Sequence, residues 1–201
     1  MKCLILTLSL AAGLSAAVGA PAVAKPNVIF VLTDDLGWTD LGCQGSKFYE
    51  TPNIDRLARE GMRFTQAYSA GTVCSPTRAA LMTGKYPARL HITDWIAGHV
   101  RPTAKLKVPD WQMHLPLEER TIAEALRDAG YATASIGKWH LGGSEFYPDR
   151  QGFDVNIGGS QIAQPPSFFY PAWKGKPPAP GQLSRGVPLD GSPGEYLTDR
   201  L

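Results

Sequence analysis

The sequence has little cysteine, little net charge and no internal repeat, and each absence narrows the classes of protein to consider. Three cysteines among 201 residues are too few for a disulfide scaffold, so a hydrophobic core must hold the fold. A formal net charge of +2 does not predict binding to nucleic acid or to an anionic membrane surface. The length suffices for one domain with a substantial core, and no linker divides it.

A long apolar run occurs only at the N-terminus. It begins with Lys2, continues through apolar residues and ends in Ala-Val-Ala at 22–24, the pattern of a secretory signal cleaved after Ala24. The alternative is an uncleaved N-terminal anchor. We expect residues 1–24 to be a signal peptide and residues 25–201 to be secreted or periplasmic, with no membrane contact after cleavage.

Segments typical of strands and of helices alternate along the mature chain. Apolar runs rich in β-branched or aromatic residues predict strands, and segments with an N-cap, an apolar stripe and a closing glycine predict helices. The predicted strands are 28–32, 62–70 and 131–136, and the predicted helices are 51–61, 75–84 and 121–130. This alternation predicts an α/β fold with a mostly parallel central sheet flanked by helices.

In such a sheet, ligands bind beyond the carboxyl ends of the strands. Three segments are expected there: Asp34-Asp35, the loop that carries Cys74, and Gly137–His140. After Gly142 the chain is rich in proline and glycine, which predicts long irregular loops. Such segments are uncommon inside a compact domain. We therefore expect the chain to be the front part of a larger domain, incomplete at its C-terminus.

Cys74 stands directly before a predicted helix start. Ser75 is a suitable N-cap, and Gly84 can end the helix. The N–H groups at a helix N-terminus favour an anion, and Arg78, one turn later, adds a fixed positive charge. The setting indicates an anion-binding active-site residue at position 74. The alternatives are a quiet buried cysteine and a disulfide with Cys43.

Two adjacent carboxylates and a lysine–histidine pair are further candidates. Asp34 and Asp35 repel each other unless a cation neutralises them, and a hard cation such as Ca²⁺ or Mg²⁺ takes oxygen ligands. Lys138 and His140 lie two residues apart, so an extended backbone would point both to one side. There a lysine can bind an oxyanion and a histidine can move a proton. The alternatives are a solvated turn for the aspartates, and a surface lysine with a hydrogen-bonded histidine for the pair.

The pentapeptide Cys74-Ser75-Pro76-Thr77-Arg78 resembles the C-x-P-x-R signature of the type I sulfatases, arylsulfatase-like, formylglycine-dependent enzymes of the alkaline phosphatase superfamily. Three more segments, PNVIFVLTDDLGWTDLGCQG, TPNIDRLAREGMRFTQAYS and TIAEALRDAGYATASIGKWHLG, are similar to early segments of that family. The resemblance runs in order from Pro26 to Gly143 and through Gln151–Asp154. It implies an alkaline-phosphatase-like fold and hydrolysis of sulfate monoesters of carbohydrates or aryl alcohols.

The resemblance implies that Cys74 does not act as a thiol. A maturation enzyme that reads Pro76 and Arg78 would convert it to formylglycine, an aldehyde. One hydroxyl of the hydrated aldehyde would attack sulfur, and the alcohol would leave. The second hydroxyl would then expel sulfate and restore the aldehyde, which is covalent catalysis with a self-releasing nucleophile.

The roles of three more residues follow from the resemblance by matching position. Arg78 would steady the formylglycine and the metal-binding carboxylates. Lys138 would bind the sulfate group. His140 would hydrogen-bond the formylglycine hydroxyl and help its proton leave.

The resemblance also implies a bound Ca²⁺. Asp34, Asp35 and the modified Cys74 would be ligands, and the cation would lower the pKa of the attacking hydroxyl. Family members carry further residues, a histidine, an Asp-Asn pair and a lysine, which no segment up to Leu201 matches. We therefore expect the 201-residue chain to bind Ca²⁺ weakly and to have little or no activity.

Two other functions remain open from the sequence. Phosphate and sulfate esters have similar shapes, so a phosphoesterase or phosphonate hydrolase of the same superfamily is one alternative. A non-catalytic module that binds anions or glycans is the other. The sequence does not choose among sugar, steroid and aryl sulfates.

Overall fold

The computed structural model describes residues 24–96, 103, 105–175 and 187–201, and the chain divides into two units. The smaller unit is Met1–Trp38 and the larger is Thr39–Leu201. The predicted signal peptide lies outside the described residues except for Ala24. Among the residues that are described, no helix is both long and apolar enough to span a bilayer.

The described part of the smaller unit, residues 24–38, contains neither helix nor strand. The prediction of a buried strand at 28–32 is wrong for this structure, because these residues form no strand and are exposed, from Leu32 at 38% to Ile29 at 89%. A strand needs a neighbour that takes up its backbone hydrogen bonds. An apolar run alone does not supply that neighbour.

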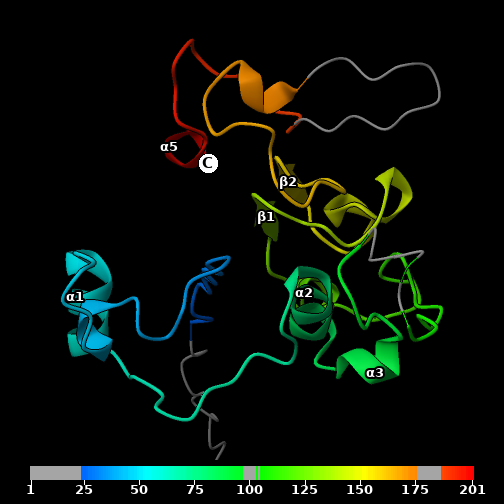
Figure 1. Ribbon diagram of the computed structural model, residues 1–201, viewed down its shortest axis with the longest axis horizontal. Helices are drawn as coiled ribbons and strands as arrows, with labels where there is room; N and C mark the ends of the chain where they lie inside the picture. Colours follow the sequence, from blue (N-terminus) through cyan, green and yellow to red (C-terminus); the bar gives the residue numbers. More distant parts are fainter. Residues whose placement is uncertain (1–23, 97–102, 104, 176–186) are drawn as a thin grey trace, which may run out of the picture. The chain divides into compact units, whose positions relative to one another are not determined.

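The larger unit contains the helices, and its first helix agrees with the sequence prediction. Helix α1 spans Pro52–Glu60 and ends at Gly61, with proline in its first turn (Figure 1). The predicted strand at 62–70 is absent, and this segment is exposed, with Met62 at 79% and Tyr68 at 85%. The other helices are α2 Cys74–Thr83, α3 Pro87–Leu90, α4 Ile122–Asp128 and α5 Leu197–Arg200, and short 3₁₀ helices span Gly42–Gln44, Ser144–Phe146, Pro148–Arg150 and Ala172–Lys174.

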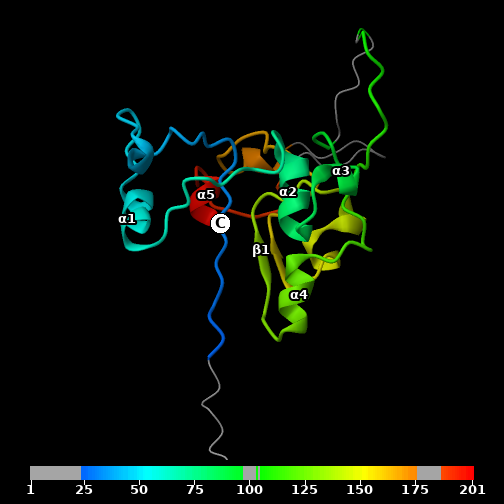
Figure 2. The ribbon, with the colours of Figure 1, turned by 90° about the horizontal axis from the view of Figure 1, so that it is seen from below.

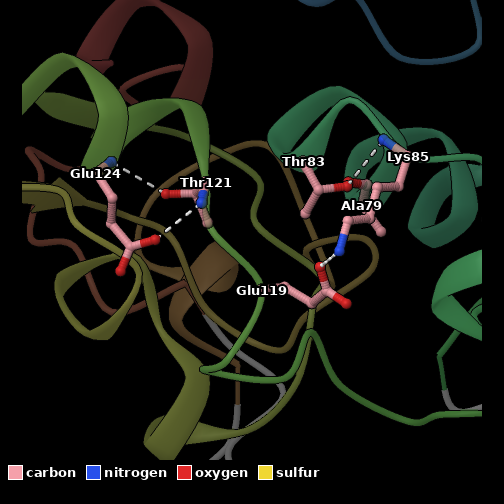
Figure 3. A network of polar contacts seen from close by, with 6 residues as sticks. All are labelled: Ala79, Thr83, Lys85, Glu119, Thr121 and Glu124. Carbon is pink, nitrogen blue, oxygen red and sulfur yellow. Dashed lines mark hydrogen bonds and ion pairs between the residues drawn. The ribbon is translucent and has the colours of Figure 1, made fainter.

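Helix α4 begins with the capping box that the sequence predicts. The backbone N–H of Glu124 donates to Thr121 Oγ1 at 3.2 Å, and the backbone N–H of Thr121 donates to the Glu124 carboxylate at 2.8 Å (Figure 3). Two of the N–H groups that lack partners at a helix start are thereby satisfied. The helix ends at Asp128, and Gly130 follows with a φ of 83°.

Two short parallel strands form the described sheet. Strand β1, Ala134–Ile136, pairs with β2, Val155–Ile157, in a register that places Ala134 opposite Val155. The sequence predicted β1 and missed β2. Figure 2 shows the pair together with helices α2 and α4 of the same unit. Parallel strands with helices confirm the predicted α/β class.

The main core of the larger unit includes residues of helix α2. It is formed by the buried side chains of Ala79, Leu90, Ile92, Leu115, Trp139 and Leu141, with Met82, Tyr147 and Phe153 packed against it. Two of these residues flank His140 in the sequence. Helix α2 packs against α3 and α4, so the helix that begins at Cys74 is fixed from several sides.

Candidate active site

Helix α2 begins at Cys74, two residues earlier than an N-cap at Ser75 predicts. Its N-cap is Val73, whose backbone is extended and whose side chain makes no capping bond. The prediction that Ser75 caps the helix is therefore wrong, because Ser75 lies inside the first turn and its hydroxyl has tertiary partners. Gly84 ends the helix in the left-handed conformation, as predicted, with a φ of 68°.

One face of α2 holds the backbone of the segment 138–140. Ser75 and Arg78 are three residues apart, so they lie on the same side of the helix. Ser75 Oγ donates to the His140 carbonyl oxygen at 3.0 Å. Arg78 Nη1 donates to the Lys138 carbonyl oxygen at 2.6 Å, and Arg78 is buried. Two segments that are 60 residues or more apart in the sequence are thus brought together.

The end of β1 positions that segment. Gly137 follows the strand with a φ of 89°, and its N–H donates to the Ile157 carbonyl oxygen of β2 at 2.8 Å. Only glycine adopts this backbone without strain. Trp139 is then buried in the core, with its indole N–H donating to Phe146 O at 2.8 Å. The sheet and this anchor therefore fix the backbone on both sides of Lys138.

His140 is fully buried and has an unusual backbone conformation. Its φ is 59°, in the left-handed region, and its N–H donates to Ser160 O at 2.9 Å. Its ring Nε2 is hydrogen-bonded to the carbonyl oxygen of Ile96, and the Ile96 N–H donates to Ser75 Oγ at 3.0 Å. The sequence singled out His140 and Lys138. It did not point to Ile96 or Ser160, which contribute backbone oxygens that every residue type has.

Cys74 and Lys138 are both half-buried, whereas His140 is not exposed at all. Cys74 is the first residue of a ten-residue helix, so the N–H groups of the first turn lie next to it. Cys74 and Cys43 are both free thiols, so the alternative of a disulfide between them is not realised. The arrangement gives residue 74 a helix N-terminus and, one turn later, a buried guanidinium.

The far end of α2 is tethered by polar contacts that Figure 3 shows. Thr83 Oγ1 donates to Ala79 O at 2.8 Å and accepts the backbone N–H of Lys85 at 3.2 Å. The Lys85 ammonium forms an ion pair with Glu119, and their side chains are 38% and 20% exposed. The pair links the end of α2 to the segment before α4. Both ends of the helix are therefore held to other parts of the larger unit.

The predicted metal ligands Asp34 and Asp35 belong to the smaller unit. Both are exposed, and Asp35 has a φ of 57°. Carboxylates suit a hard cation, but two of them supply at most about four of the six to eight oxygens that Ca²⁺ takes. Within the described ranges, no three histidine, cysteine, aspartate or glutamate side chains are grouped so as to hold a metal ion. The two carboxylates are therefore the type of ligand that Ca²⁺ takes, but they are too few to complete its coordination shell.

Comparison with known proteins identifies related chains. The family model described as Sulfatase matches residues 26–200. The chain is 45% identical to canine N-acetylgalactosamine-6-sulfatase over 160 residues, which is 77% of this chain and 28% of that protein. It is 45% identical to human arylsulfatase A over 157 residues (76% and 28%) and 47% identical to human steryl-sulfatase over 121 residues (60% and 20%).

Solved structures also resemble this chain in sequence and in fold. The crystal structure of Ps i-CgsB is 32% identical, with a TM-score of 0.65, and covers 88% of this chain and 39% of that one. A structure from work on the metabolism of multiple glycosaminoglycans by Bacteroides thetaiotaomicron is 36% identical, with a TM-score of 0.54, and the match covers 66% of this chain and 28% of that one. The chain therefore has the corresponding alkaline-phosphatase-like fold in part. It spans less than a third of the length of the curated relatives named above.

Proposed function

Because this chain belongs to the sulfatase family, we propose that the protein it represents hydrolyses sulfate monoesters with a nucleophile made from Cys74. The observation that carries the proposal is the pair of hydrogen bonds from Ser75 and Arg78 to the backbone of 138–140. Through them, one helix face holds the nucleophile position, a guanidinium, a lysine and a histidine in one part of the larger unit. These are the groups that a sulfuric ester hydrolase needs around an anionic ester.

Formylglycine at position 74 would supply a hydrated aldehyde with one hydroxyl for attack and a second for release of sulfate. The chain's own residues prepare the site for that group. The first turn of α2 directs its N–H groups and the positive end of its dipole toward anionic charge near residue 74. We assign Lys138 to binding the sulfate oxygens, and His140 to hydrogen bonding the hydroxyl at residue 74 and accepting its proton.

Arg78 has two parts in this proposal. Its hydrogen bond to the Lys138 carbonyl oxygen holds the lysine's backbone against α2. Its charge stays fixed one turn from residue 74, because a guanidinium does not lose its proton in proteins. A lysine at position 78 would keep the charge, but it would not reproduce the planar fork of donors.

We propose Ca²⁺ as the cofactor, with Asp34, Asp35 and the modified Cys74 among its ligands. Support comes from the type of donor and from the family. Since the described residues contain too few grouped donors, the 201-residue chain should bind Ca²⁺ weakly and turn over little substrate. If the purified chain hydrolyses an aryl sulfate at a rate typical of enzymes, the assignment of missing ligands is wrong.

The substrate class is a sulfate monoester, of a carbohydrate or an aryl alcohol. The names of the relatives span sugar, aryl and steryl compounds, so they do not choose among these. Export to a secreted or periplasmic location, and a maturation enzyme as partner, belong to the same proposal. Relative rates on matched sulfate and phosphate esters, measured on the full-length protein, separate this activity from that of a phosphoesterase.

Mass spectrometry of the tryptic peptide 64–78, taken from protein made in its own host, tests the nucleophile directly. We expect an aldehyde in place of the thiol at Cys74. Cys43 is not followed by the C-x-P-x-R motif, so it is the internal control and should keep its thiol. An intact thiol at Cys74, in a host shown to convert another motif cysteine, would overturn the proposal.

A further inference from the structure

We propose that Ser75 is a positioning residue that fixes the imidazole of His140 in one tautomer and ties it to the first turn of α2. Three hydrogen bonds among Ser75, Ile96 and His140 form a closed ring, which we call the Ser75 ring. Its functional meaning rests on the proposed sulfatase activity. The tautomer itself does not, and it can be measured without any turnover.

The donors and acceptors of the Ser75 ring allow one assignment of protons. A serine hydroxyl has a single proton, and at Ser75 this proton is donated to the His140 carbonyl oxygen. Ser75 Oγ is therefore the acceptor for the Ile96 N–H. The carbonyl oxygen of Ile96 can only accept, so the His140 Nε2 bonded to it must carry a proton. In the neutral ring, the lone pair is consequently on Nδ1.

Burial makes this assignment strict. Ser75 and His140 are each 0% exposed, so water does not replace a partner that is lost. A buried donor or acceptor without a partner is costly, so the hydroxyl of Ser75 and the ring of His140 depend on these bonds, whereas Ile96 is half-buried. The protonation of Nε2 is thus set by the fold rather than by solvent.

The backbone of His140 shows that specific contacts hold this residue. Its φ of 59° is unfavourable for a residue with a side chain. The conformation is fixed on both sides, because the N–H of His140 donates to Ser160 O and its carbonyl oxygen accepts from Ser75.

The Ser75 ring couples the histidine to the nucleophile position. Ser75 follows Cys74 directly in the first turn of α2, so a shift of that turn moves residue 74 and the His140 carbonyl together. A proton acceptor at Nδ1 would then keep its direction relative to residue 74. Ser75 acts through His140 and does not itself need to touch the substrate.

The tautomer can be read from long-range ¹H–¹⁵N spectra of the chain labelled in its four histidines, with His140 assigned by comparison with a chain in which it is replaced. We expect the Nε2–H pattern for His140 at neutral pH. A His140 that shows the Nδ1–H pattern, or averaged tautomers, would overturn the proposal. The tautomer is read in the chain without any substitution, and the variant serves only to assign the His140 signal.

Variants test the part played by the hydroxyl. In Ser75→Ala, we expect mixed tautomers at His140 and roughly tenfold faster hydrogen exchange at the Ile96 amide, because this amide loses its hydrogen bond to the Ser75 hydroxyl. Ser75→Thr keeps a hydroxyl, so the His140 tautomer and the Ile96 exchange rate should both match those of the original chain. Thr83→Ala removes a hydroxyl from the other end of α2 and should change neither. Unchanged Ile96 exchange and an unchanged tautomer in Ser75→Ala would refute the assigned role.

The two proposals fail separately. Suppose that His140 shows the Nε2–H pattern but Cys74 stays a thiol in a host that converts other motif cysteines. The role of the Ser75 ring would then be supported, and the sulfatase mechanism would be overturned. Conversion of Cys74 to the aldehyde together with averaged tautomers at His140 would support the sulfatase mechanism and overturn the role assigned to Ser75.

Discussion

Replacing Thr121 with valine should destabilise the larger unit by about 2–4 kcal/mol. Thr121 is 1% exposed, and its hydroxyl has two partners: it accepts the Glu124 N–H and donates to Gln151 O at 2.7 Å. Valine keeps the shape and removes both bonds. Loss of the N-cap bond costs about 1 kcal/mol. Leaving the buried Gln151 carbonyl oxygen without a donor costs about 1–3 kcal/mol more.

The effect matters for the site because Thr121 stands at the start of a chain of hydrogen bonds that leads toward His140. The Gln151 side-chain amide donates to Leu115 O at 2.8 Å, and the Leu115 N–H donates to Leu141 O at 3.0 Å. Leu141 directly follows His140. A loosened cap at α4 should therefore weaken the support behind the candidate active site as well as the helix.

Urea unfolding followed by tryptophan fluorescence measures this loss, since Trp139 and Trp173 are buried in the larger unit. Thr198→Val, at an exposed threonine of α5, is the matched control and should change the free energy of unfolding by less than about 0.5 kcal/mol. A loss at Thr121 that is no larger than the control's would show that the double role of this hydroxyl has been misjudged.

Two further predictions concern close packing and acid stability. Gly152→Ala should destabilise the unit by about 2–4 kcal/mol, since φ is 93° and a Cβ would lie 2.4 Å from Glu124 Cγ and 2.7 Å from Glu124 N. Gly84→Ala is the control, because φ is positive there but a Cβ would have no atom within 4 Å. Its free energy of unfolding should fall by only about 1–2 kcal/mol. Equal losses for the two variants in urea unfolding would contradict the clash at Gly152. The Cys43 N–H donates to Asp55 and holds the pKa of that carboxyl below its ordinary value. The ionised carboxylate therefore stabilises the folded state above about pH 4, and this contribution is lost as the pH falls through the folded pKa. Asp55→Asn should therefore flatten the fall in stability on acidification, and an unchanged pH profile of unfolding would argue against it.

Local chemistry made helices α1, α2 and α4 predictable from the sequence. The capping box at Thr121 and Glu124, and the glycines at 61 and 84, depend on residues within one turn of each other, and the structure has them as expected. Strands depend on partners that the sequence does not specify. The apolar run 28–32 has no partner strand in the described part of its unit, whereas the short β2, with no clear alternation, pairs with β1.

The sequence singles out the side chains of the candidate site but not the bonds that connect them. The C-x-P-x-R motif singled out Cys74 and Arg78, and the G-K-W-H segment singled out Lys138 and His140. The bonds that join the two segments end on backbone oxygens, which no residue type reveals. Ser75 shows the limit most clearly, since its local preference to cap the helix is overridden by tertiary partners.

The left-handed backbone at His140 decides which substitution can isolate the chemistry of its ring. Alanine would remove the imidazole and keep a Cβ in the left-handed region, at a cost of about 1–2 kcal/mol that the native histidine already bears. Asparagine tolerates this conformation far better, because its short polar side chain bonds locally. A comparison of His140→Asn with His140→Ala therefore separates the contribution of the imidazole from that of the backbone that carries it.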